Sequence, residues 1–262
     1  MKKIFKKEKL VSLGYGIFGL AAFLLFWWLV VRFTSVGNVL PSPFTVFAKL
    51  FDSITHPIGK HTLLVHLGYS IGRVMIGYTA AAILGIITGL AMAQSETANA
   101  IIRPLFAIIR PIPGITWMPL AILWFGIGSF TKIFIIFVGG FAHMVINTYA
   151  GAKRADQQLI GAALMLGATK RQLFSKVILP STVPYIFAGL QVSLSSCWMA
   201  VLAAEMISST EGAGWIIVAG QDNGNITQVI VGVIAIAIVG LILANAMRAT
   251  EHRLCAWAER GR

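Results

Sequence analysis

Two ionisable residues, Arg73 and Glu205, lie inside segments that are otherwise apolar enough to cross a membrane. An arginine at the centre of a bilayer costs about 2.5–3.5 kcal/mol on insertion scales, so such residues usually have a function or a partner. Arg73 could line the path of an anion, or it could pair with Glu205, and we favour pairing slightly. Glu205 by itself would repel an anionic solute.

Other polar residues in or beside the apolar segments could also meet a solute. Arg110 could line a path, but we favour a different role, in which its side chain extends to the inner membrane interface and anchors the chain there. Ser195, with Ser193 and Ser196, could hydrogen-bond a polar solute or support close packing of helices. The candidate residues of a translocation path are therefore Arg73, Arg110, Ser195 and Glu205.

The sequence contains no motif for energy conversion of its own. A phosphate-binding P-loop requires Gly-x4-Gly-Lys-Ser/Thr. The nearest candidate, Gly59-Lys60-His61, has Ile54 in place of the first glycine and His61 in place of the hydroxyl. There is no His-Glu-x-x-His motif and no His/Cys cluster with metal-ligand spacing. We expect no catalytic residue, no metal site and no cofactor in this chain, and any ATP hydrolysis must occur in another chain.

The composition predicts a polytopic helical membrane protein. Of the 262 residues, 57% are hydrophobic and only 11% are charged, with a mean hydropathy of +0.82. Soluble domains are about 45–50% apolar and about 25% charged, so the surplus apolar surface must face lipid. We expect one transmembrane domain over residues 1–262, located in the cell membrane.

The net charge of +12 arises from basic residues beside the spans, as the positive-inside rule expects for cytoplasmic ends. These residues are Lys2, Lys3, Lys6, Lys7 and Lys9, then Lys153, Arg154, Lys170, Arg171 and Lys176, then Arg248, Arg253, Arg260 and Arg262. Their placement predicts that both termini and the central basic segment face the cytoplasm. It also argues against a nucleic-acid partner.

About six spans are expected, each near the 20 residues that a helix needs to cross the hydrocarbon core. They cover about residues 15–33, 64–92, 101–126, 132–149, 184–207 and 227–247. A short interfacial helix is expected at 44–51 and an outer loop at 208–225. Gly85-x-x-x-Gly89 predicts close packing of the second span, and Arg110-Pro111-Ile112-Pro113-Gly114 predicts an interfacial loop or a broken helix.

The central segment, residues 155–184, is typical of a helix, an elbow and a second helix. Asp156 is a candidate N-cap, Gly167 a candidate terminator, and Thr169 with Gln172 fits a capping box. We expect Pro180 to end the second helix and Ser181 or Thr182 to cap the fifth span. By pattern alone, an ordinary amphipathic loop that lies on the membrane is as good an interpretation as an elbow that contacts a partner. A third interpretation, a DNA-binding helix-turn-helix, does not fit between two spans that are only a few residues away.

The string GAALMLGATKRQLFSKVILP resembles the EAA signature of binding-protein-dependent ABC transporter permeases. Val177 replaces the family isoleucine, and Gly161 stands where the family usually has glutamate. The resemblance implies that a segment at about 150–183 couples the chain to an ATPase. The implied coupling residues are Gly161, Ala162, Ala163, Gly167, Ala168, Thr169, Leu179 and Pro180.

Further strings, such as RPIPGITWMPLAILWFGIG and AAEMI, resemble the nitrate/sulfonate/taurine branch. This resemblance implies a type I ABC importer permease that works as a homodimer. Its implied partners are two cytoplasmic ATPase subunits, which bind ATP and Mg, and an extracytoplasmic solute-binding protein. The implied solute is a small anion imported by alternating access. A vitamin or pyrimidine precursor remains an alternative solute, and a channel or ion-driven transporter remains an alternative class.

Overall fold

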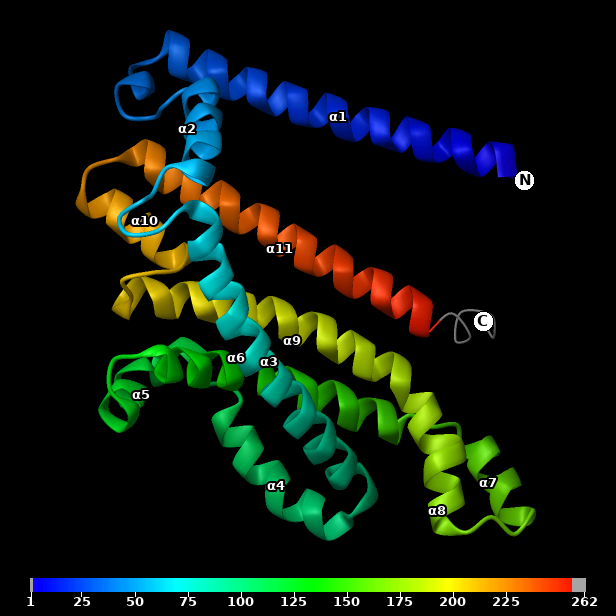
Figure 1. The fold of residues 1–262 in the computed structure, drawn as a ribbon. Coiled ribbons are helices and arrows are strands. Elements are labelled where there is room, and N and C mark those ends of the chain that lie inside the picture. Colours follow the sequence, from blue (N-terminus) through cyan, green and yellow to red (C-terminus); the bar gives the residue numbers. More distant parts are fainter. Residues whose placement is uncertain (1, 256–262) are drawn as a thin grey trace. The chain divides into compact units, whose positions relative to one another are not determined.

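The computed structural model describes the backbone of residues 2–255 and the side chains from residue 14 onward (Figure 1). Within these bounds the chain is almost entirely helical, which confirms the predicted all-α class. The elements are α1 (Lys2–Phe33), η1 (Ser35–Asn38), α2 (Pro43–Thr55), α3 (Leu63–Gln94), α4 (Glu96–Ile109), η2 (Gly114–Trp117), α5 (Met118–Phe125), α6 (Ser129–Lys153), α7 (Gln157–Met165), α8 (Lys170–Leu173), η3 (Phe174–Ile178), α9 (Leu179–Ser208), α10 (Ala213–Asp222) and α11 (Ile226–Leu254). The side chains of Lys2, Lys3, Lys6, Lys7 and Lys9, and all of Arg260 and Arg262, lie outside the described residues.

Five described helical stretches are long and apolar enough to cross a membrane. They are Gly14–Phe33, Leu63–Gln94, Ser129–Lys153, Lys170–Asp222 and Ile226–Leu254. A sixth span arises if Glu96–Ile109 and Gly114–Phe125 form one broken span, since the two parts are bent by 87° at the break. The Arg110–Gly114 segment that we singled out lies at this bend. The number of spans therefore agrees with the predicted six.

The chain divides into two compact units. The first contains Met1–Leu63 and Ile216–Ala235, and the second contains Leu64–Trp215 and Ile236–Arg262. In the first unit, the Gln228 side-chain amide donates to the Ile216 carbonyl oxygen at 3.0 Å, which ties the start of α11 to α10. The candidate functional residues all lie in the second unit.

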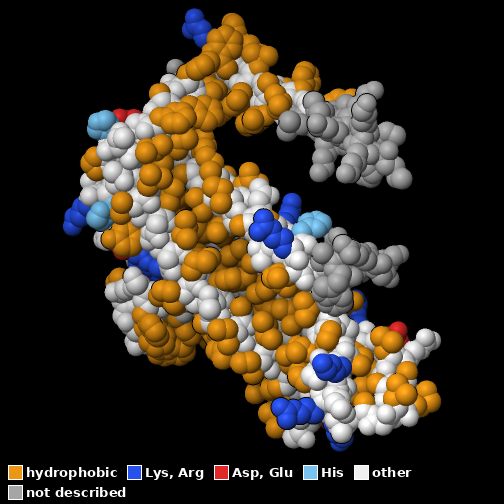
Figure 2. Space-filling model, turned by 45° about the vertical axis from the view of Figure 1, so that its right-hand side comes forward, with side chains coloured by type: hydrophobic (Ala, Val, Ile, Leu, Met, Phe, Trp, Pro, Cys, Tyr) orange, Lys and Arg blue, Asp and Glu red, His pale blue; other side chains and the backbone are white. Residues whose placement is uncertain are grey.

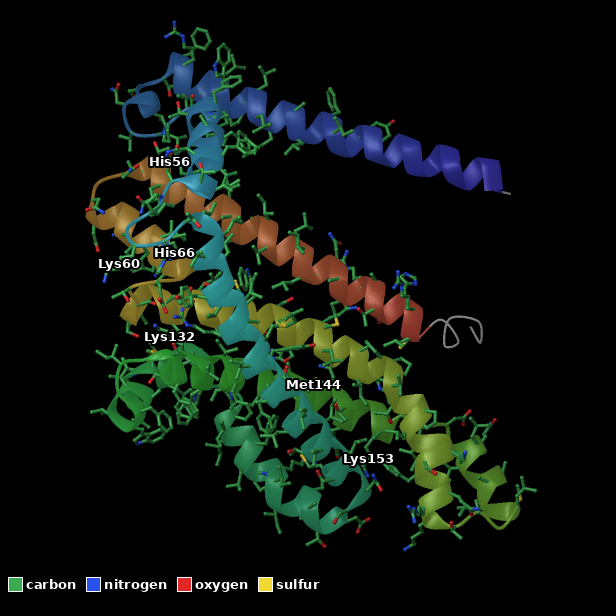
Figure 3. All side chains as sticks on the ribbon, viewed as in Figure 1. His56, Lys60, His66, Lys132, Met144 and Lys153 are labelled. Atoms are coloured by element: carbon green, nitrogen blue, oxygen red, sulfur yellow. The ribbon has the colours of Figure 1, made fainter. Side chains whose placement is uncertain are left out.

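In the second unit, α6 packs against both α3 and α9, and glycines allow the close approach. A Cβ at Gly85 would lie 2.5 Å from Met144 Cβ, and one at Gly89 would lie 2.8 Å from Thr148 Cβ. Met144, labelled in Figure 3, is fully buried and also contacts Gly189 of α9. The Gly85-x-x-x-Gly89 pair therefore lies against a neighbouring helix, as the sequence predicted.

Polar side chains hold α9 to α6 inside this apolar contact. Ser193 Oγ donates to the Gly140 carbonyl oxygen at 3.0 Å, and Cys197 Sγ lies 3.4 Å from the Ile136 carbonyl oxygen. Gly140 itself leaves room for both side chains. Ser193 therefore supports helix packing, one of the two roles that its sequence position allowed.

The prediction that Pro180 ends the second elbow helix is wrong. Helix α8 continues through the π-helical η3 into α9, so Pro180 lies in the first turn of α9. Proline lacks a backbone donor, which is tolerated in the first turn of a helix, and the neighbouring Ser181 Oγ donates to the Val177 carbonyl at 2.8 Å. Thr182 Oγ1 donates to the Ile178 carbonyl at 2.7 Å. The hydroxyls that we expected to cap a new helix thus supply hydrogen bonds to a continuous one.

The prediction of a plain loop at 208–225 is also wrong, because α10 occupies Ala213–Asp222. The first-turn N–H groups of a helix need acceptors, and here these come from other helices. The Ala213 N–H donates to Ser70 Oγ at 2.8 Å, and the Gly214 N–H donates to Glu205 Oε2 at 3.1 Å. A helix start that is capped by distant residues leaves no local sequence signature. Helix α2 is also longer than the predicted 44–51.

The close contact at Gly85 can be tested with Gly85→Ala. We expect a loss of about 1–3 kcal/mol in unfolding free energy, because the added methyl overpacks the α3–α6 contact. Thermal unfolding of the purified protein in detergent measures this loss. Gly72→Ala is the matched control on the same helix, because a Cβ there meets nothing within 4 Å. Equal midpoints for the two variants would contradict the packing.

Candidate functional site

The predicted coupling segment forms a rigid elbow between α7 and α8. Asp156 caps α7, because its side chain accepts from the Gln158 N–H at 2.8 Å. After Leu166 the chain turns through Gly167, whose φ of +80° is a left-handed conformation that favours glycine. The Gly167 N–H donates to the Leu164 carbonyl at 2.9 Å, and the Ala168 N–H donates to the Ala163 carbonyl at 3.0 Å. This pair of bonds is the Schellman helix end, which confirms Gly167 as the terminator.

The second half of the elbow begins immediately after this turn. Thr169 Oγ1 accepts from the Gln172 N–H at 3.3 Å, while Gln172 Oε1 accepts from the Thr169 N–H at 2.8 Å. This is the reciprocal capping box that the sequence predicted. Both sides of the turn are thus fixed by hydrogen bonds, so the elbow can transmit a displacement without bending at its apex.

The tip of the elbow is apolar and uncovered. None of the residues of α7 is buried, and the side chains of Met165 and Leu166 are 86% and 89% exposed. Lys170 and Arg171 follow on the exposed α8. Figure 2 shows that hydrophobic side chains cover much of the visible face, with several Lys and Arg side chains toward its lower end. An apolar tip beside cations is suited to a groove on a partner protein.

The other coupling candidates lie on this elbow or at the helix that continues from it. Gly161, Ala162 and Ala163 are on α7, whereas Leu179 and Pro180 begin α9. A Cβ at Gly161 would meet nothing within 4 Å, so packing within this chain does not require a glycine there. The family glutamate would fit at this position.

A second candidate site surrounds the carboxylate of Glu205, which is buried in α9. Arg73 Nη1 of α3 donates to Glu205 Oε1 at 2.7 Å, and Ser70 Oγ donates to Glu205 Oε2 at 2.8 Å. The Gly214 N–H completes the shell at 3.1 Å. The predicted Arg73–Glu205 pair is therefore confirmed, and the carboxylate has charge and hydrogen-bond partners that offset its burial.

Two further charged residues balance this site. Arg73 Nη2 lies 2.5 Å from Glu211 Oε1, so one guanidinium joins two carboxylates. The buried Lys132 of α6 donates from Nζ to Ser209 Oγ at 2.9 Å, and Ser209 Oγ donates to the Glu211 carbonyl oxygen. The site thus holds two cations and two carboxylates. Its charges cancel within the buried region, which lowers the cost of keeping them there.

The loop after α9 is shaped by this site. Gly212 has φ of +116°, and a Cβ there would overlap the Glu205 carboxylate, so only glycine fits. The Gly212 N–H donates to His66 Nδ1 at 3.1 Å, and the His66 ring stacks on Trp215 with centroids 5.0 Å apart. Figure 3 labels His66 and Lys132, which approach this loop from α3 and α6. We call the whole set the Glu205 network: His66, Ser70, Arg73, Lys132, Glu205, Ser209, Glu211, Gly212 and Gly214.

The structure does not bring Arg110 and Ser195, the other two candidate residues of a translocation path, into the Glu205 network. Arg110 is exposed at the end of α4, and Ser195 is exposed on α9, where its Oγ donates to the Gln191 carbonyl oxygen at 3.2 Å. Our sequence reasoning missed the parts played by Lys132 and Glu211. One signal of a polar cluster was available in the sequence. The spacing of His66, Ser70 and Arg73 places three polar residues on one face of an apolar helix, and such a face needs polar partners on a neighbouring helix.

The described residues contain no group of three His, Cys, Asp or Glu side chains positioned to hold a metal ion. The contacts of the Glu205 network neutralise its charges mutually and fix the loop after α9. The chemistry open to the elbow is recognition of a protein surface.

Residues 81–254 match the family described as "Binding-protein-dependent transport system inner membrane component". The chain belongs to this family, so it is a multi-pass inner membrane permease subunit of an ABC importer. The elbow and the broken α4–α5 span both lie within the matched region.

Two curated relatives support the predicted branch. The taurine transport system permease protein TauC of Escherichia coli (strain K12) is 36% identical over 250 residues, covering 94% of this chain and 90% of that protein. The nitrate import permease protein NrtB of Synechocystis sp. is 32% identical over 212 residues, covering 79% of this chain and 77% of that protein. The chain is thus similar to the nitrate/sulfonate/taurine permeases over most of its length.

A solved structure with the same fold is the MetNI methionine ABC transporter in an inward facing conformation. The TM-score is 0.60 at 19% identity, with 73% of this chain and 94% of that chain covered. This similarity confirms the predicted type I ABC importer permease fold.

The Arg73–Glu205 pair can be tested by a double-mutant cycle. Arg73→Met should cost about 3–5 kcal/mol in unfolding free energy, because it leaves buried carboxylate charge uncompensated. Arg73→Met combined with Glu205→Leu should cost less than the sum of the single variants, because it removes one charge of each sign. Thermal unfolding in detergent provides the measurement.

The control for this cycle is Glu96→Gln, which removes an exposed acid from the first turn of α4 and should cost no more than about 1 kcal/mol, the usual contribution of a charge at that end of a helix. Additive single and double effects, or an Arg73→Met variant as stable as Glu96→Gln, would rule out the pair as a structural contact.

Proposed function

We propose that this chain imports a small oxyanion of the taurine, sulfonate or nitrate type, driven by a separate ATPase that docks on the α7–α8 elbow. The observation that carries this proposal is the elbow itself, which is capped on both sides of Gly167 and has an uncovered apolar tip. The taurine and nitrate relatives support the class of solute.

In this proposal the chain contributes no nucleotide chemistry of its own. Two cytoplasmic ATPase subunits bind ATP and Mg²⁺, and an extracytoplasmic solute-binding protein delivers the oxyanion. Closure of the ATPases displaces the elbow, and the spans alternate between inward-open and outward-open arrangements. Because α8, η3 and α9 form one continuous helix, displacement of the elbow acts directly on a span.

The alternative of an ion-driven transporter is less well supported. A proton relay requires intramembrane acids or histidines that are free to exchange protons. Here Glu205 is held by an arginine, a serine and a backbone N–H, and it lies among charges that cancel. A carboxylate in this environment is suited to a structural role.

The proposed docking is tested with Leu166→Asp, which places a charge on the exposed tip. If the tip lies at the centre of the contact with the ATPase subunit, losing that contact reduces the binding free energy by about 2 kcal/mol or more, which is roughly 30-fold in affinity. Co-purification of the ATPase subunit and substrate-stimulated ATP hydrolysis by the reconstituted complex should both fall accordingly.

Gln157→Asp is the matched control, because it adds the same charge to an exposed position at the opposite end of α7. A negative charge in the first turn of a helix is favourable, so this variant should keep both activities. Unchanged ATPase co-purification and substrate-stimulated ATP hydrolysis with Leu166→Asp would remove the tip from the docking contact.

We further propose that a second copy of the chain covers the α4–α5 break. Non-helical backbone at membrane depth requires protein or a water-filled cavity to satisfy its polar groups, and this break follows Arg110 in an otherwise apolar region. On the element that follows the break, Leu123 near the end of α5 is 81% exposed, and Ile127 just after α5 is 76% exposed. A partner copy on this surface would place the break along a central path.

This arrangement predicts cross-linking between copies through Leu123→Cys, with Cys197 and Cys255 replaced by alanine. Oxidation in native membranes should give a disulfide-linked dimer, detected on a non-reducing gel. Leu241→Cys is the control, because Leu241 is also an exposed apolar residue but lies on α11 and not on the proposed α4–α5 interface. Equal dimer yields at the two positions, or none at 123, would argue against this interface.

A further inference from the structure

A cavity in the second unit lies between α9 and α11 and has a volume of about 250 Å³. Its polar lining consists of Gln191, Ser195, Trp198 and Arg248, and its apolar walls are Leu194, Met199, Leu243, Ala244 and Met247. The cavity does not include the Glu205 network or the elbow. The size is close to that of the smaller ligand sites of proteins.

Glycine at position 240 keeps the cavity open beside Trp198. A Cβ at Gly240 would lie 3.2 Å from the indole Nε1, so any side chain there would press against the N–H edge of the ring. Trp198 is itself almost fully buried. A tryptophan N–H is a donor only, and the Trp198 side chain lines this cavity.

The charged group of the cavity is Arg248. It forms no ion pair with a residue in the described part of the chain, whereas Arg73 pairs twice. The nearby Glu251 is engaged by the Gln191 side-chain amide, and Glu251 does not line the cavity. The guanidinium therefore remains available as a donor of two parallel hydrogen bonds to an oxyanion.

The donors of this cavity share one chemical preference. The Arg248 guanidinium, an indole N–H and the hydroxyl of Ser195 suit an oxyanion, while methionine and leucine side chains suit a short apolar group. Ser195 Oγ donates to the Gln191 carbonyl oxygen in this structure, so it would turn its hydroxyl toward a ligand. A neutral solute would leave the guanidinium unmatched.

We propose that this cavity binds an oxyanion that carries a short apolar group. Two sources have this chemistry: an organic sulfonate that enters the permease, and the phosphate of an anionic phospholipid whose tail lies against Met199 and Leu243. The first source rests on the proposed function, since it makes the cavity a resting site for the imported solute. The second is independent of the solute.

The test uses the full permease–ATPase complex in phosphatidylcholine nanodiscs without ATP. Propane-1-sulfonate is titrated while tryptophan fluorescence is recorded, with propan-1-ol as the uncharged probe. We expect a saturable change with the sulfonate alone, and Trp198→Phe should abolish it. Arg248→Gln should weaken binding at least tenfold, because Arg248 is the one cation among the described residues that line the cavity.

Arg253→Gln is the matched control, because Arg253 is exposed on the same helix but does not line the cavity. This variant should bind the sulfonate within twofold of the unmodified complex. Gly240→Ala provides a second variant that keeps the charge, and it should weaken binding by narrowing the space beside Trp198.

The lipid source is measured in nanodiscs that contain phosphatidylglycerol. Native mass spectrometry should then show retained phosphatidylglycerol that Arg248→Gln releases and Arg253→Gln keeps, with no saturable sulfonate signal. Absence of both ligands, or equal effects of Arg248→Gln and Arg253→Gln, would overturn the cavity as an oxyanion site. ATPase coupling through Leu166 is measured separately, so failure of this site would leave the proposed coupling intact.

Discussion

The carboxylate of Glu205 is the constraint on which the second unit depends. An acid buried in an apolar bundle is tolerable only if an opposite charge and hydrogen-bond donors surround it. Arg73 and Ser70 from α3 and the Gly214 N–H from α10 meet this requirement together. The need to neutralise one side chain thus fixes the register of α3 against α9, and it determines where the following loop must turn.

The same helix joins this constraint to the elbow. From Lys170 to Ser208 the chain is continuously helical, with a π segment before Pro180, and at 1.5 Å per residue it extends roughly 60 Å. One end carries the capped turn at Gly167, and the other carries Glu205. In the proposed mechanism, this helix, held near one end by Glu205 and exposed at the other, transmits a displacement of the elbow to the bundle. The glycine contacts with α6 leave little space for independent movement between the two ends.

Local signals were sufficient for the elements whose ends are capped by their own neighbours. Asp156, Gly167 and the Thr169–Gln172 pair were all correctly interpreted from sequence, because each hydrogen bond joins residues at most five positions apart. The prediction that Pro180 ends a helix was wrong for a related reason. The chain passes Pro180 in a continuous helix through the wider π turn at Phe174–Ile178, with added hydroxyl bonds from Ser181 and Thr182, and proline alone does not reveal this geometry.

The sequence alone determined the class of the protein, the approximate spans and the elbow, because hydrophobicity, charge placement and capping residues are local properties. It also suggested that Arg73 and Glu205 could pair, since isolated charges in lipid are costly. Only the tertiary structure decided that Lys132 and Glu211 join them, that α10 replaces a loop, and that Gly240 leaves a cavity beside Arg248. These features depend on which helix faces meet, and that is set by packing between residues far apart in the chain.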